Sequence, residues 1–160
     1  MNFAHLHLIL NHLPVFTTLF GLILVIASGI GDRPAVLRIG LFTLIAGALV
    51  AIPAYLTGEP AEGVIEHVSG IAAGSIDAHE EIAGIALAVS VLLGIVATVM
   101  AFRMRAQIVP SRSFIVALLA LTTVSTSLFG VTAYFGGQIH HTEIASGSSR
   151  PVNPSQADED

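Results

Sequence analysis

Four uninterrupted apolar runs constrain the fold of this chain more than any other feature. They cover residues 13–30, 39–56, 82–102 and 114–135, and each contains 18 to 22 residues. At about 1.5 Å of rise per residue, a helix of about 20 residues crosses a hydrocarbon layer of about 30 Å. The runs therefore predict an all-α protein, a four-helix transmembrane bundle.

Composition indicates the same class and limits the chemistry. Hydrophobic residues make up 54% of the 160 positions, charged residues make up 11%, and lysine is absent. This is too little polar surface for a soluble domain, so we expect the lipid bilayer as the surroundings. A net charge of -5 gives no reason to expect nucleic acid as a partner. Because there is no cysteine, any metal must be held by histidine, methionine or carboxylate side chains.

The arginines predict the orientation of the bundle. Arg33 and Arg38 flank the first connection, and Arg103, Arg105 and Arg112 flank the third. Under the positive-inside rule both connections face the cytoplasm. The N- and C-termini are then expected on the outer, periplasmic side of the membrane.

All seven histidines fall on that outer side. They are His5, His7, His12, His67, His79, His140 and His141. Counting back along the spans places His12 at the outer edge of the hydrocarbon layer, with His79 and His140 within roughly 10 Å of that depth. Imidazoles that reach one depth from three different helices are what a haem or metal site in a bundle requires.

These histidines differ in how well they fit a ligand role. His12 is bracketed by leucines and, with His79, forms the favoured pair of ligands; His7 or His140 comes next. His67 is a further candidate for a metal site. The alternative for each is a solvated or interfacial histidine, as expected for His5 and His7 close to the N-terminus.

The rest of the outer side has features of its own. Apolar residues recur at helical spacing near 60–68, which predicts a short helix on the membrane surface. Gly136 and Gly137 are expected to end the fourth span. The predicted membrane domain therefore covers 1–141, and the polar tail 142–160 is expected to be disordered unless a partner orders it.

Three short motifs resemble those of a known family. They are H-x4-H-x-P, present as His7, His12 and Pro14; T-G, present as Thr57 and Gly58; and His79 at the start of the third span. This combination looks like an uncharacterised four-helix bacterial membrane family, known mainly as a domain of unknown function. The resemblance implies a multi-pass protein of the bacterial inner membrane and makes His7, His12 and His79 family-type positions. In architecture alone, the chain is similar to membrane b-type cytochromes.

The leading functional hypothesis is a haem b binding subunit with its cofactor near the outer face. Two histidines from different helices would supply the axial nitrogens. The subunit would relay electrons between a periplasmic redox partner, docked by residues 142–160, and quinone or another subunit. No arrangement of catalytic acid, base or nucleophile stands out, so we expect an electron-transfer subunit rather than a self-sufficient enzyme.

Two alternatives remain open from the sequence. The first is a periplasmic-face site for copper, zinc or non-haem iron, formed by histidines with Asp77, Glu80 and Glu81. These carboxylates could also orient His79, or simply stabilise the start of their helix. The second alternative is a non-catalytic accessory or assembly subunit of a membrane complex.

Overall fold

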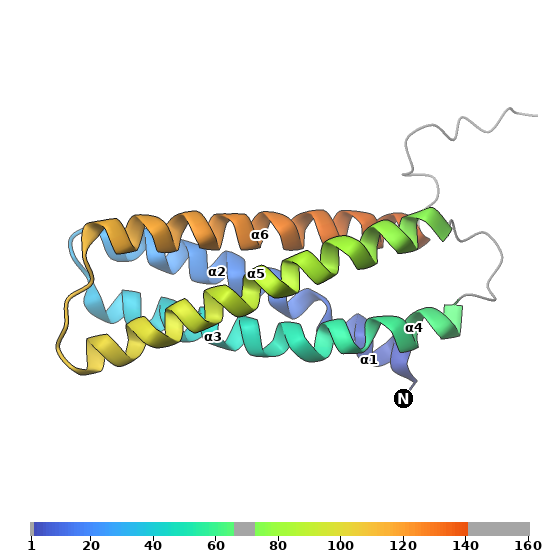
Figure 1. Ribbon diagram of the computed structural model, residues 1–160, viewed down its shortest axis with the longest axis horizontal. Helices are drawn as coiled ribbons and strands as arrows, with labels where there is room; N and C mark the ends of the chain where they lie inside the picture. The colour runs from blue at the N-terminus through green and yellow to red at the C-terminus, as the bar shows by residue number, and fades with distance from the viewer. Residues whose placement is uncertain (1, 66–72, 141–160) are drawn as a thin grey trace, which may run out of the picture.

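The computed structural model describes residues 2–65 and 73–140, and every regular element in this part of the chain is a helix (Figure 1). The elements are α1 (Phe3–Leu10), α2 (His12–Gly29), α3 (Pro34–Leu56), α4 (Gly58–Ile65), α5 (Ala73–Arg105) and α6 (Arg112–His140). The pairs α1–α2 and α3–α4, together with α5 and α6, give four stretches long and apolar enough to cross a membrane. The all-α architecture and the multi-pass character expected from the sequence are confirmed.

The two ends of the bundle differ. The turn between α2 and α3 and the loop between α5 and α6 lie at one end, while the start of α1 and the end of α6 lie at the other (Figure 1). The first turn is tight because Gly31 and Asp32 adopt φ angles of 80° and 51°, a region that glycine and aspartate enter more readily than bulkier residues. Pro34 then starts α3 in the position that suits its fixed φ.

Large apolar side chains cover the outside of the bundle. Phe16 and Phe42 are 65% and 60% exposed, whereas Thr18, Thr122 and Ser125 are fully buried. The buried threonines donate to carbonyls one turn back in their own helices, as in the 2.8 Å bond from Thr18 Oγ1 to Pro14 O. Apolar surroundings and an interior rich in small residues are typical of helices that pack inside a bilayer.

The end with the two connections holds the main core. Leu41 and Leu44 of α3, Leu93 of α5 and Leu118 of α6 are almost completely buried there. Close helix approach supports this packing, because a Cβ added at Gly94 would lie only 2.5 Å from Ala48 Cβ. The arginine end is therefore a tightly packed apolar bundle.

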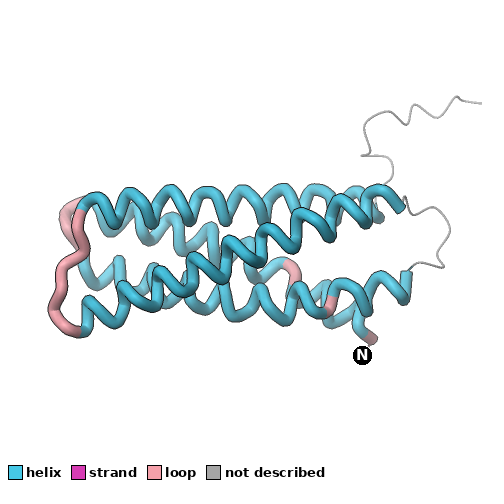
Figure 2. Tube along the Cα trace, in the orientation of Figure 1, coloured by secondary structure: helices cyan, strands magenta, loops and turns pink. Residues whose placement is uncertain are grey.

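The opposite end is built from two broken helices. Pro14 cannot donate a backbone hydrogen bond and its ring clashes with the preceding turn, so the chain breaks at Asn11, between α1 and α2. Pro53 lies inside α3, which ends at Thr57 before α4 begins. Figure 2 shows both breaks on the same side of the bundle. The short helices beyond the breaks, α1 and α4, pack against each other.

Some predicted boundaries differ from the structure. Gly136 and Gly137 do not end the fourth span, because α6 continues to His140. A neighbouring side chain packs over Gly136, as described below, and tertiary packing of this kind outweighs the weak helix propensity of glycine. The helix predicted near 60–68 is described as α4 over Gly58–Ile65. Residues 66–72 and 141–160, which include His67, His141 and the tail, lie outside the described residues.

Substituting Gly94 tests the close approach of α3 and α5. Gly94→Ala should lower the free energy of unfolding by about 1–3 kcal/mol, because the new methyl group overpacks against Ala48. Gly130→Ala is the matched control, because nothing lies within 4 Å of its added Cβ. Both variants gain the same helix propensity, so denaturation in detergent should separate them by the packing term. Equal stabilities would contradict the described packing.

Candidate functional site

A cavity of about 500 Å³ lies at the end of the bundle opposite the main core. Its walls come from α1 and the junction of α3 with α4 on one side, and from α5 and α6 on the other. Val15, Leu87 and Phe129 line it and also belong to the apolar cluster next to it. In the described part of the chain neither α1 nor α4 packs extensively on α5 or α6. At this end of the bundle, the cavity therefore separates α1 and α4 from α5 and α6.

His7 projects into this cavity from α1. Its Nδ1 lies 3.0 Å from the backbone oxygen of Ala54 and 3.2 Å from Thr57 Oγ1. Ala54 is in the last turn of α3, and its carbonyl oxygen also accepts a 2.9 Å hydrogen bond from Thr57 Oγ1. A carbonyl oxygen only accepts hydrogen bonds, so the Nδ1 atom of His7 must carry the proton. The break at Thr57 thus provides the group that orients this imidazole.

His79 projects from α5 on the opposite wall. Its Nδ1 lies 2.9 Å from the backbone oxygen of Thr132 in α6, again an acceptor. Gly136, one turn further along α6, makes room for the ring: a Cβ there would lie 3.0 Å from Cε1 and 3.1 Å from Nδ1 of His79. The glycine that the sequence placed at a helix end instead allows the imidazole to approach the backbone.

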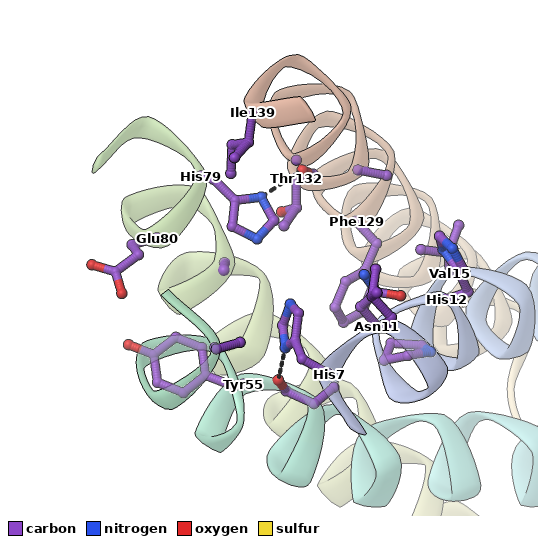
Figure 3. Close-up of a pocket in the computed structure, with 18 of the residues that line it drawn as sticks. His7, Asn11, His12, Val15, Tyr55, His79, Glu80, Phe129, Thr132 and Ile139 are labelled. Carbon is purple, nitrogen blue, oxygen red and sulfur yellow. Dashed lines mark hydrogen bonds between the residues drawn. The ribbon is translucent and has the colours of Figure 1, made fainter. Parts of the chain in front are cut away.

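The two imidazoles face each other across the cavity. Their ring centroids are 6.5 Å apart and their planes are nearly perpendicular, at 83°. Figure 3 shows the nitrogen of each ring that is not hydrogen-bonded turned toward the other ring. With Nδ1 protonated, the Nε2 of a neutral imidazole carries a lone pair. Two lone pairs directed at one space favour an electron-pair acceptor between them.

The separation agrees with a metal centre held by both rings. With metal–nitrogen bonds of about 2.0 Å and a ring radius of about 1.2 Å, two imidazoles on opposite sides of one metal would have centroids roughly 6.4 Å apart. The observed separation is 6.5 Å. A protonated Nδ1 that donates to a backbone carbonyl is also the usual support for a metal-binding histidine.

Small residues widen the cavity around the two rings. Those along its walls are Ala4, Ala51, Ala54, Gly58, Ala61, Ala83, Ala133, Gly136 and Gly137. This lining is mostly apolar, but Glu62 and Glu80 also belong to it and no arginine does.

The three carboxylates that the sequence associates with His79 are exposed. Glu80 is exposed, and Figure 3 shows its carboxylate directed away from His79. Asp77 and Glu81 are exposed as well, and the Nδ1 partner of His79 is a backbone carbonyl rather than a carboxylate. In residues 2–65 and 73–140, no group of three or more His, Asp or Glu side chains could hold a metal ion.

The other candidate histidines lie apart from the facing pair. His12 lines the cavity, but it is exposed and well separated from His7 and His79 in Figure 3. His5 is exposed and its Nδ1 lies 3.1 Å from Asn2 Oδ1. His140 is the last residue of α6, and its side chain lies outside the described part. The pair that the structure brings together is therefore His7 with His79, not the favoured pair of His12 with His79.

The short motifs quoted from the sequence meet at this site. Thr57 is within hydrogen-bonding distance of His7, and a Cβ added at Gly58 would lie 3.7 Å from the same ring. Pro14 lines the cavity as well. No protein-family model, curated protein or solved structure matches this chain. The family resemblance therefore rests on these motifs and on the four apolar helices.

The hydrogen bonds of the two histidines predict which ring nitrogen carries the proton. In the ligand-free protein at neutral pH, His7 and His79 should both be protonated at Nδ1, because each Nδ1 faces a carbonyl oxygen. The ¹⁵N chemical shifts of imidazole-labelled protein in bilayers would report this tautomer. His7→Ala and His79→Ala assign the signals by removing them. A protonated Nε2 on either ring would contradict the described site.

Proposed function

We propose that this chain is a membrane subunit that binds one haem b between His7 and His79 and relays electrons. The observation that carries the proposal is the facing pair of imidazoles, 6.5 Å apart, each with Nδ1 at a backbone carbonyl. Haem iron with two axial histidines needs only two protein ligands. The absence of a third ligand among the described residues therefore argues against copper, zinc or non-haem iron more than against haem.

The surroundings of the pair support a porphyrin. The cavity is mostly apolar, and its volume of about 500 Å³ lies in the usual range for cofactor pockets. Without cysteine, attachment would be non-covalent, as in haem b proteins. Because Glu62 and Glu80 line the described cavity and no arginine does, the two haem carboxylates are expected to project toward water at the end of the bundle.

The position of the site supports a role in electron transfer at one face of the membrane. The site lies at the end opposite Arg33, Arg38, Arg103, Arg105 and Arg112. By the positive-inside rule this end would face outward, which is the periplasmic side in the bacterial inner membrane that the family resemblance implies. The arginine end is filled with leucine and methionine side chains and has no described histidine. A single haem near the periplasm would exchange electrons with a periplasmic redox partner and with quinone or a neighbouring subunit.

An absorption spectrum tests this proposal. The full chain, expressed with a haem precursor and purified in detergent, should show the sharp visible bands of a six-coordinate low-spin b haem after reduction with dithionite. His7→Ala and His79→Ala should each abolish the six-coordinate spectrum, whereas His5→Ala should keep it. If His12 were the second ligand, His12→Ala rather than His7→Ala would lose these bands. Protein that takes up no haem under these conditions would refute the proposal.

Gly136 provides a second test that leaves both histidines in place. Gly136→Ala should weaken haem binding by about 10- to 100-fold, the usual cost of disturbing a residue that orients a metal ligand. The added methyl group forces the ring of His79 away from the Thr132 carbonyl. Titration of haem into the apoprotein measures the change. Gly130→Ala, on the same helix with open space around its Cβ, should bind haem as the unmodified chain does.

A further inference from the structure

The two walls of the cavity are held in very different ways. His79 belongs to α5, a helix of 33 residues that packs along α6. His7 belongs to α1, a helix of eight residues with no buried residue. Few buried contacts give an element a low cost of local opening. His7 is therefore on the less stable of the two walls.

The junction between α1 and α2 lacks a side-chain cap. Asparagine is a favoured N-cap residue, yet Asn11 makes no capping hydrogen bond from its side chain to α2. Pro14, where an N-cap side chain would find a backbone N–H, has none to offer. Asn11 Oδ1 is buried without a hydrogen-bond partner and lines the cavity. A buried polar atom without a partner is costly, so opening of α1 about Asn11 would relieve this cost.

A limited set of interactions then holds His7 over the cavity. They are the contacts of Nδ1 with Ala54 O and Thr57 Oγ1, and the packing of α1 on α4 and, less extensively, on α3. Ala4 and Leu8, on the same helix, line the cavity beside His7. Movement of α1 would uncover one face of the bound group and leave mostly apolar surroundings.

We propose that His7 is the exchangeable ligand of the pair, and that its departure opens a binding position for a small uncharged diatomic molecule such as carbon monoxide or nitric oxide. This inference rests on the proposed haem function. In the exchange, the bond between the iron and His7 Nε2 breaks and a bond from iron to the diatomic molecule forms, with no change in oxidation state. His79 stays bound, because α5, α6 and Gly136 hold it in place.

Binding of carbon monoxide to the reduced, haem-loaded full chain tests the inference. Because His7 must leave first, the observed rate should level off as the carbon monoxide concentration rises. Thr57→Val, which removes one contact of His7, should raise the plateau rate by about 2- to 10-fold. The matched control is Thr43→Val within α3, whose hydroxyl donates to Ile39 O one turn back; it should leave the plateau rate unchanged.

Variants of the two histidines give an independent readout. His7→Ala should bind carbon monoxide at a rate proportional to its concentration, without a plateau, while His79→Ala should lose most of its haem. Haem-loaded protein that never binds carbon monoxide would overturn the inference and leave the haem proposal intact. The same holds if His79→Ala, rather than His7→Ala, gives the rapidly binding form. A chain that takes up no haem overturns both.

Discussion

Two backbone carbonyls fix how the two histidines face the cavity. Ala54 O and Thr132 O each lie at the Nδ1 of a histidine, which leaves the Nε2 lone pairs of His7 and His79 directed at each other. If the rings were protonated at Nε2 instead, two N–H groups would face each other and no metal could bind. A tautomer fixed by the main chain is more robust than one fixed by a side chain, because the carbonyl cannot change its protonation state.

These carbonyls are accessible for different local reasons. In a membrane, nearly every backbone group is satisfied within its own helix, so an additional acceptor is uncommon. Ala54 O lies in the last turn of α3, where it accepts from the Thr57 hydroxyl and is also reached by His7 Nδ1. Thr132 O lies inside a continuous helix, and the ring of His79 reaches it because Gly136 has no side chain. Each histidine is thus hydrogen-bonded to a backbone carbonyl, at a helix end on one wall and beside a glycine on the other.

Hydropathy was sufficient to predict the helices, because each apolar run has the length of the membrane. It could not predict the pairing of His7 with His79. Counting residues along straight helices favoured His12, but the break at Asn11 redirects α1 and carries His7 over the cavity, while His12 is exposed. The sequence also did not predict the role of Gly136, because a glycine near the end of an apolar run more often ends a helix than makes room for a ring from another helix. Both features depend on the direction of side chains, which residue spacing alone does not determine.

One end of the bundle holds the packed core and the other end holds the cavity. At the arginine end, fully buried leucines leave little free space, and Gly94 packs closely on Ala48 toward the middle of the bundle. At the other end, helix breaks and small residues leave α1 and α4 apart from α5 and α6 around the histidines. Such a cavity is tolerated because the core elsewhere holds the helices together. A flat group bound there would contact both walls, and its binding energy would then add to the stability of the fold.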